Sequence, residues 1–273
     1  VILCMKQSLK LFLAFLFFLI SCKNNNENEP IDDCNGDLGG IAFLNPCDVC
    51  VGGNTEIPED SCASVLDIDG NIYNTIIIGN QAWMVENLKV TRFRDGTSIP
   101  LSYGPAWVNL ETSGFNVYYQ YENNQQFSRH GNLYNWFAVN DSLKIAPEGW
   151  HIPTDDEWKV LEKTLGVKER DLDSLSWRGT DEGGKLKDTG FEYWDSPNTG
   201  ATNETGFTAI PGGYLDYYFG NFVGNGLYCY FWTATGYKSG KSAWYRLLNN
   251  INSAISRQAT NKKNGFSVRC VKD

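Results

Sequence analysis

The sequence predicts an α+β protein with small antiparallel sheets, long loops and few helices. Gly accounts for 27 of the 273 residues and charged residues for only 20%, a composition that favours short strands and turns over a helical bundle. Aromatic residues make up 14% of the chain, so a sizeable core can form and wholesale disorder is excluded. The net charge of −9 argues against the basic surface that nucleic-acid binding requires.

The N-terminal segment has the pattern of a secretory signal. Lys6 and Lys10 follow Met5, which we expect to be the start, and an apolar run occupies 11–20. As a helix this run rises only about 15 Å, which is too short for a hydrocarbon core of about 30 Å. We therefore predict a signal peptide over 1–21 rather than a transmembrane anchor.

The signal ends in Ser21-Cys22, which resembles the lipobox of bacterial lipoproteins. In that family the Cys thiol is diacylated and its new amine is acylated after cleavage, and several acyl chains on one residue give stable anchoring. The resemblance implies lipidation of Cys22, with ordinary secretion as the alternative. Residues 22–32 then form a flexible tether. Because Lys23 gives no inner-membrane retention signal, we expect a lipoprotein of the outer membrane, anchored to the membrane by its lipid.

Four cysteines lie close together in the next segment: Cys34, Cys47, Cys50 and Cys62. In the oxidising environment of a secreted chain, such a cluster favours two disulfides over a four-cysteine zinc site. The spacing alone leaves the pairing open. We predict a small disulfide-rich spacer over 33–64.

This spacer is acidic, since residues 22–64 hold one Lys and nine acidic residues. It resembles short Cys- and Asp-rich repeats of bacterial surface proteins, which are compared with calcium-binding repeats. Carboxylate oxygens are the ligands that calcium prefers, so the resemblance makes four residues weak calcium candidates: Asp32, Asp33, Asp37 and Asp48. The regular Asp spacing of a calcium loop is missing, and a solvated acidic spacer is the favoured interpretation.

The main domain, 65–273, begins with signals for turns and strands. β-Branched and aromatic residues over 72–78 are followed by Gly-Asn at 79–80 and by a second apolar run at 81–85. Two such runs around a two-residue Gly-Asn loop predict a β-hairpin. The Asp-x-Asp-Gly sequence at 67–70 lacks the rest of a calcium-loop pattern and predicts a tight turn.

One helix has both a start and a stop signal. Thr154 and Glu157 have the spacing of a capping box, and Gly166 is suited to end the helix. Three apolar residues lie on one face of this helix: Trp158, Leu161 and Leu165. We also predict a second short helix near 182–187, long loops over 188–226, and strands at 228–233, 243–248 and 266–271.

Seven motifs occur in one order along this domain, at 83–88, 131–136, 149–158, 183–187, 205–213, 231–235 and 265–271. Together they resemble the Fibrobacter succinogenes major paralogous domain, a family of bacterial secreted and lipid-anchored proteins. The resemblance covers nearly all of 65–273. It implies a C-type-lectin-like fold, similar to that of formylglycine-generating enzymes, with two helices, small antiparallel sheets and long loops.

The cysteines of the domain depart from the family pattern. The family usually has a Cys before the Pro-x-Gly-Trp-His segment, and the resemblance implies that it pairs with the Cys of the last strand. Ala146 stands at that position here, so Cys270 lacks this partner. Cys229 is the other thiol of the domain. A bridge between Cys229 and Cys270 requires Cα atoms within about 7 Å, and the sequence leaves it open whether they pair.

The resemblance also suggests a ligand site in the long loop. In C-type lectins a loop of Glu, Pro and Asn holds calcium, which binds sugar hydroxyls. Four residues of this loop are therefore weak ligand-binding candidates, with Ca²⁺ as a possible cofactor: Asp195, Asn198, Asn203 and Glu204. A turn driven by Pro197 and Gly200 explains the same residues without a ligand.

These observations favour a non-catalytic protein of the cell envelope that binds a glycan or a protein. A structural scaffold is the alternative. An enzyme of the formylglycine-generating type is disfavoured because that chemistry needs a reactive cysteine pair with a lowered pKa, and the domain has only Cys229 and Cys270, without matching surroundings. His151 is expected to be structural, with its ring hydrogen-bonded near the start of the helix. No motif of a common hydrolase or nucleotide-binding site occurs.

Overall fold

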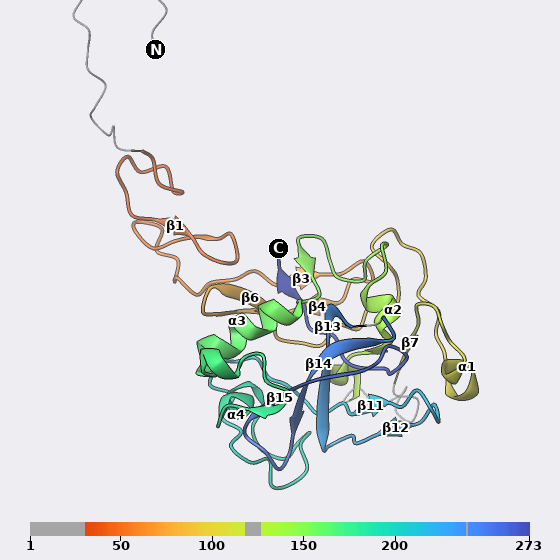
Figure 1. The fold of residues 1–273 in the computed structure, drawn as a ribbon. Helices are drawn as coiled ribbons and strands as arrows, with labels where there is room; N and C mark the ends of the chain where they lie inside the picture. Colours follow the sequence, from red (N-terminus) through yellow and green to blue (C-terminus); the bar gives the residue numbers. More distant parts are fainter. Residues whose placement is uncertain (1–30, 118–126, 239) are drawn as a thin grey trace, which may run out of the picture.

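The computed structural model describes residues 31–117, 127–238 and 240–273 (Figure 1). Within these residues the chain has four short α-helices and several small antiparallel sheets, in agreement with the predicted α+β class. The predicted signal peptide, Cys22 and most of the predicted tether lie outside the described residues. No helix within the described part is long and apolar enough to cross a membrane.

The larger sheet is antiparallel and has the strand order β10-β15-β14-β13. Its strands are β10 (Ser176–Arg178), β13 (Tyr228–Tyr237), β14 (Ser242–Asn249) and β15 (Ile255–Asn261). The sequence analysis predicted β13 and β14 but missed β15. That strand has few apolar residues, so it lacks the alternation that marks a half-buried strand.

The second sheet has the strand order β5-β6-β16-β9. Its strands are β5 (Thr75–Ile78), β6 (Gln81–Met84), β9 (Trp150–His151) and β16 (Val271–Lys272). Strands β5 and β6 form the predicted hairpin, with Ile78 opposite Gln81 across the Gly-Asn turn. The predicted strand 266–271 is reduced to β16, because Phe266 and Ser267 form only single bridges with Tyr134 and Phe231.

The remaining elements are short. The two-stranded sheets pair β1 (Phe43–Leu44) with β2 (Cys50–Val51), β3 (Val65–Leu66) with β4 (Ile72–Tyr73), β7 (Phe115–Asn116) with β8 (Leu133–Tyr134), and β11 (Tyr214–Leu215) with β12 (Phe222–Val223). The helices are α1 (Gly104–Val108), α2 (Trp136–Val139), α3 (Asp155–Leu165) and α4 (Glu182–Leu186). Single 3₁₀ turns occupy Phe127–His130 and Glu169–Asp171.

Helix α3 has the boundaries that its sequence predicts. The Thr154 hydroxyl accepts a hydrogen bond from the Glu157 amide, and the Glu157 carboxylate accepts one from the Thr154 amide. Gly166 ends the helix with φ of 122°, a conformation that other residues rarely adopt. Helix α4 confirms the second predicted helix. Helices α1 and α2 were not predicted, since four or five residues are too few for a periodic pattern.

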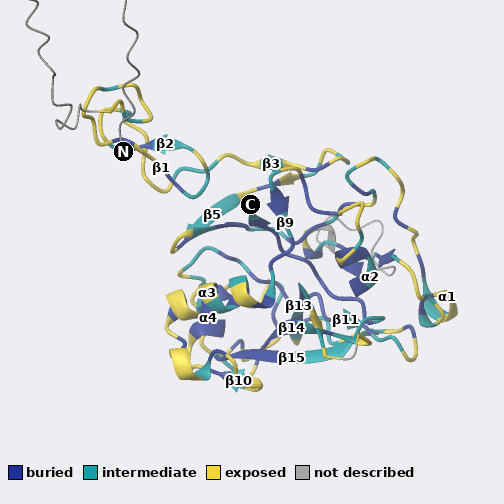
Figure 2. Cartoon of the chain, turned by 45° about the horizontal axis from the view of Figure 1, so that its top comes forward, coloured by how far each residue is buried: buried dark blue, intermediate teal, exposed yellow. Residues whose placement is uncertain are grey.

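The larger sheet separates two hydrophobic clusters, because side chains alternate between the faces of a strand. On β13, Cys229 and Phe231 join the cluster under α3, whereas Trp232 joins the cluster that contains Tyr134 and Phe266. Trp158, Leu161 and Leu165 of α3 are all buried against this sheet, as predicted. Figure 2 shows the resulting division of α3 into a buried and an exposed side.

A buried ion-pair network joins α3 to the larger sheet. Glu162 is fully buried and pairs with Arg246 of β14 at 2.5 Å and with Arg178 of β10. Asp155 at the start of the helix pairs with Arg246 at 2.7 Å and with Arg257 of β15 at 2.6 Å. Burial alone raises the pKa of Asp155, but the two arginines outweigh it and lower the pKa to about 2.

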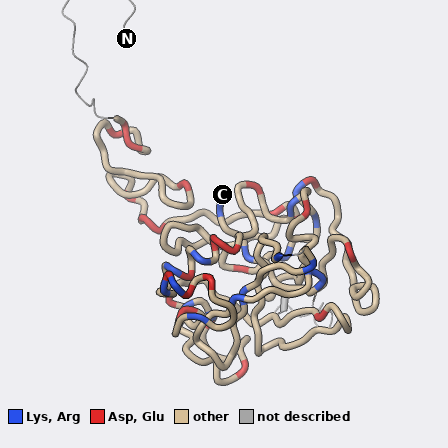
Figure 3. The backbone as a smooth tube through the Cα atoms, viewed as in Figure 1, with Lys and Arg blue, Asp and Glu red and all other residues tan. Residues whose placement is uncertain are grey.

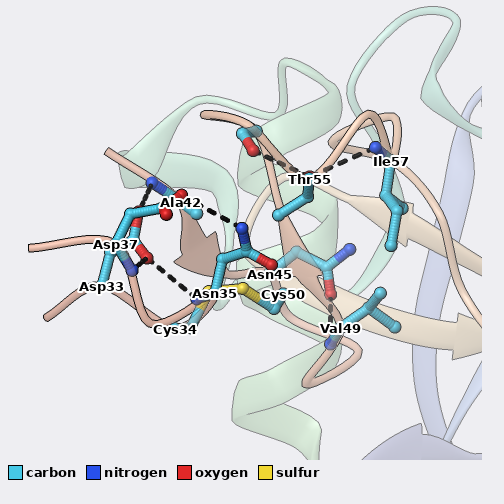
Figure 4. The surroundings of a disulfide bond; sticks show 11 residues. Asp33, Cys34, Asn35, Asp37, Ala42, Asn45, Val49, Cys50, Thr55 and Ile57 are labelled. Atoms are coloured by element: carbon cyan, nitrogen blue, oxygen red, sulfur yellow. Dashed lines mark hydrogen bonds between the residues drawn. A yellow bond between two sulfur atoms is a disulfide. The ribbon is translucent and has the colours of Figure 1, made fainter. Parts of the chain in front are cut away.

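The spacer contains the two predicted disulfides, which connect Cys34 with Cys50 and Cys47 with Cys62. The two closed loops interlock, because Cys47 lies within the first loop and Cys50 within the second. Figure 4 shows the Cys34–Cys50 bond beside the turn that Asp33 stabilises. Figure 3 shows acidic residues along the spacer. It contacts the head through an ion pair between Asp48 and Lys272 of β16.

Cys229 and Cys270 are free and buried. The bridge that the sequence left open is therefore not formed. The physical reason is that the two side chains belong to different clusters, Cys229 under α3 and Cys270 in the cluster with Trp232.

His151 lies between two carboxylates, as expected for a structural residue near the helix start. Its Nε2 is 2.7 Å from Glu157 Oε1, and its Nδ1 is 2.7 Å from Asp273 Oδ1. The Glu157 hydrogen bond raises the pKa of His151, partial burial opposes this, and Asp273 adds to the increase. A protonated His151 therefore ties the end of the chain to α3.

Substitution of Glu162 tests the buried network. Glu162→Gln keeps the shape of the side chain but leaves Arg178 and Arg246 without this counter-charge, so we expect unfolding to become easier by about 3–5 kcal/mol. The control Glu169→Gln removes an exposed partner of Lys163 and should change stability by less than about 1 kcal/mol. Urea unfolding of the purified protein measures both. Equal effects for the two variants would contradict the role of the network.

The surroundings of His151 predict a pH dependence. Because its folded-state pKa is raised, its contribution is complete below the unfolded value of about 6.5 and is lost as pH rises through the folded value. His151→Gln should therefore reduce the free energy of unfolding more at about pH 5.5 than at about pH 9. Urea unfolding across this range measures the difference between variant and wild type. A gap that is independent of pH would show that the charge of His151 is unimportant.

Candidate binding site

The four acidic calcium candidates of the tether and spacer have different surroundings. The Asp33 carboxylate accepts hydrogen bonds from the backbone amides of Asn35, Asp37 and Ala42 at 2.9–3.0 Å. Asp37 accepts one from the Asn35 side chain at 3.1 Å, Asp32 is exposed, and Asp48 pairs with Lys272. Nowhere in the described residues do three or more His, Cys, Asp or Glu side chains form a group suited to a metal ion. The calcium hypothesis for these residues stays a prediction.

The four candidates in the long loop also have separate local roles. The Asn198 side chain donates to the carbonyls of Asp188 and Gly190, both at 3.0 Å. Glu204 lies 3.7 Å from the Lys185 ammonium. Asn203 binds the Thr208 hydroxyl and amide at 3.0 and 2.8 Å.

The backbone amide of the fourth candidate, Asp195, donates to the Gly226 carbonyl at 2.8 Å. The contacts of Asp195, Asn198 and Asn203 are made within the loop, and Glu204 joins the loop to Lys185 of α4. A role of these four residues in ligand or calcium binding stays a prediction.

Lys187 holds this loop through a contact that the sequence analysis missed. Its ammonium donates to the backbone carbonyls of Thr199, Asn249 and Asn252 at 2.8, 3.0 and 3.0 Å. The side chain is fully buried and lies over the Trp194 ring. Burial lowers the pKa of Lys187 to about 8. All three N–H donors of the ammonium are satisfied, so Lys187 ties the loop to the end of β14 and to the segment after it.

A pocket of about 550 Å³ opens elsewhere on the head. It lies between the segment after β6, the 3₁₀ turn at Arg129, the first part of the long loop, and the segment before β16. Six charged side chains line it: Glu86, Lys89, Arg129, Asp188, Glu192 and Arg269. Tyr193, Thr208 and Ile210 complete one wall with an aromatic ring, a hydroxyl and an apolar surface. A volume of a few hundred Å³ with few well-placed polar groups is typical of small-ligand sites.

Arg269 forms the buried base of this pocket. Its side chain is 1% exposed. Its Nε and Nη2 donate to Asn87 Oδ1 at 3.1 and 2.8 Å, and its Nη1 donates to the carbonyls of Met84 and Phe207 at 3.0 and 2.6 Å. The guanidinium also lies 4.2 Å from the centre of the Phe207 ring. These contacts fix the position of the guanidinium. Burial lowers the pKa of Arg269 to about 10.

The mouth of the pocket contains an ordered aromatic group. Arg129 Nη1 donates to the Tyr193 hydroxyl at 3.1 Å. The centres of the Tyr193 and His130 rings are 5.7 Å apart, and the two rings are nearly perpendicular. Burial raises the pKa of Asp188, and Glu192 adds to the increase. The arrangement offers a ligand hydrogen-bond donors, acceptors and one ring face.

Sequence reasoning named none of these pocket residues as a binding site. Arg269 lies within the motif 265–271, and Glu86 and Asn87 lie within the motif 83–88. The motifs therefore contain part of the pocket, but they did not predict that these residues form one. Arg129, Asp188 and Glu192 lie outside every motif. Only the fold brings them beside Arg269.

The comparisons with known proteins concern the same region. The sequence model of the Fibrobacter succinogenes major domain matches residues 76–272, which is well over half of the chain. Neither the curated proteins nor the solved structures include a significant match. The matched range contains both four-stranded sheets except the first residue of β5, all four described helices and most of the pocket. The chain therefore belongs to the family of the Fibrobacter succinogenes major domain.

Proposed function

We propose that this protein is a lipid-anchored protein of the outer membrane whose C-type-lectin-like head binds a glycan without catalysing a reaction. The observation that carries the proposal is the pocket between Tyr193 and Arg269. Carboxylates and amides pair well with sugar hydroxyls, and the face of a Tyr ring packs against the apolar face of a sugar while its hydroxyl stays hydrogen-bonded. The signal and lipobox patterns of the sequence support the location.

The state of the cysteines supports a non-catalytic role. Burial raises the pKa of Cys229 and of Cys270 to about 12, although Arg269 acts in the opposite direction on both. A reactive cysteine needs a lowered pKa and access to solvent. Both thiols are fully buried, which argues against chemistry of the formylglycine-generating type.

A structural scaffold remains a second candidate because of the tip of the β11–β12 hairpin. Tyr218 and Phe219 are 67% and 68% exposed there. Their backbone amides donate to the Asp216 carboxylate at 2.9 and 2.8 Å, so the tip is held in one conformation. Exposed aromatic residues in an ordered turn suit the contact surface of a protein partner.

A glycan array with two matched variants separates these candidates. Tyr193→Ala removes the ring from the pocket and should weaken binding of the recognised glycan at least about tenfold, whereas Tyr218→Ala on the hairpin should leave it unchanged. The glycans that bind wild type are then titrated by calorimetry with each variant. A blank array together with capture of an envelope protein that requires Tyr218 would favour the scaffold.

The same titration, repeated with a chelator, addresses calcium. We expect binding to be unaffected, because Lys187 already holds the long loop with its ammonium. Loss of binding on chelation would instead support the calcium-dependent lectin hypothesis and would return attention to Asp195 and Asn198.

A further inference from the structure

Arg269 differs from the other buried arginines in what compensates its charge. Arg178, Arg246 and Arg257 each pair with a buried carboxylate of α3. Within the described residues, the hydrogen bonds of Arg269 go to neutral oxygens, those of the Asn87 side chain and of two backbone carbonyls, and the negative charge of Glu86 acts on it only without a direct ion pair. Neutral partners satisfy N–H groups but do not replace a directly paired counter-ion, whose absence is costly for a buried charge.

The pocket is where this charge can meet a ligand. Arg269 is almost completely buried yet lines the cavity. Lys89 and Arg129 line the same cavity, so three cationic side chains surround it. Four of the five N–H groups of Arg269 donate within the protein, which leaves one N–H of Nη2 for a ligand. A hydrogen bond from a charged donor is strongest when its acceptor is a carboxylate or another anionic group. The geometry therefore suits an anionic group on the ligand.

The acidic side chains of the pocket restrict what else the ligand carries. Glu86 is already engaged, because its two oxygens accept hydrogen bonds from the backbone and side-chain amides of Asn74, both at 2.7 Å. Asp188 and Glu192 lie on the wall formed by the long loop. Their oxygens accept hydrogen bonds from hydroxyls, but they repel a ligand with several negative charges. One carboxylate combined with several hydroxyls fits both sides of the pocket.

We propose that the pocket binds an acidic sugar, a uronic acid at the end of or within a glycan, and that the sugar carboxylate pairs with Arg269. The sugar hydroxyls face Asp188 and Glu192, and its ring lies against Tyr193. This inference rests on the proposed function, since it names the class of glycan that the pocket takes. It also gives the buried charge of Arg269 a directly hydrogen-bonded anionic partner, where the described residues provide neutral oxygens.

Calorimetric titration with the methyl glycoside of galacturonic acid, which carries one carboxylate, and with the methyl ester of the same glycoside tests the proposal. The ester keeps the sugar ring and hydroxyls but removes the negative charge, so we expect the acid to bind at least about tenfold more tightly. A peptide with a free C-terminal carboxylate is titrated in parallel and should not bind. Equal binding of acid and ester would overturn the acidic-sugar inference while leaving glycan binding intact.

Substitutions of pocket residues test whether the preference for the acid over the ester arises in the pocket. Arg129→Gln removes a positive charge and the hydrogen bond to the Tyr193 hydroxyl, so it should weaken the acid by a larger factor than the ester, which loses only the second contribution. Arg170→Gln, an exposed arginine outside the pocket, is the charge-matched control and should change neither. Arg269→Lys retains a positive charge without the planar fork, and should also weaken the acid selectively.

The remaining outcomes are also decisive. If the acid and ester fail to bind but other glycans on the array do, the inference is wrong and the proposed function stands. If no glycan binds at all, both fail. If the peptide binds as tightly as the acidic sugar does, the pocket recognises the carboxylate of a protein ligand, and the acidic-sugar inference is wrong.

Discussion

The buried ion pairs between α3 and the larger sheet fix the arrangement on which the rest of the head depends. Two carboxylates of one helix meet arginines from three of the four strands, β10, β14 and β15. Hydrophobic contacts alone tolerate small shifts of a helix along a sheet, because apolar packing is not directional. Buried ion pairs do not tolerate such shifts, because moving one partner away leaves the other as an isolated charge in the interior. We attribute to this network the register of α3 more than a net gain in stability.

Contacts from α3 also hold the C-terminal residues in place. Glu157 of α3 contacts His151 of β9, and His151 contacts Asp273, the last residue. Strand β16 therefore lies between β9 and β6, and the segment just before it runs beneath the pocket. Arg269 reaches its place because this segment is held on both sides. The spacer joins the same strand through Asp48 and Lys272, so it meets the head at its C-terminal strand.

The sequence predicted those parts of the fold that depend on neighbouring residues. The capping box of α3 and the Gly-Asn hairpin are local devices, and both are confirmed. The two disulfides were predicted because four clustered cysteines occur in a chain expected to be secreted. Which cysteine pairs with which is known only from the structure. Strand β15 was missed because Arg257 occupies a buried position where an apolar residue would be expected. Its burial depends on Asp155, about a hundred positions earlier in the chain, and no local pattern contains that information.

The candidate site was less predictable for the same reason. A family resemblance directed attention to the long loop, where Asn198 and Asn203 have the residue types of a calcium site but are used to fold the loop. The pocket residues come from segments that are far apart in sequence, and each has an ordinary local context. Arg269 in particular lies in a strongly apolar motif, where a lone arginine is as compatible with a structural ion pair as with a ligand.

A comparison of Lys187 with Arg269 separates these two uses of a buried cation. Both lack a carboxylate partner within the described residues, and burial lowers the pKa of both. Lys187 is enclosed, however, and its three donors point to three backbone carbonyls, so nothing further can approach it. Arg269 lines a cavity, and its hydrogen bonds to neutral oxygens leave one N–H group for a ligand. A cation that only stabilises the fold gains nothing from a cavity beside it, whereas a cation that binds a ligand requires one.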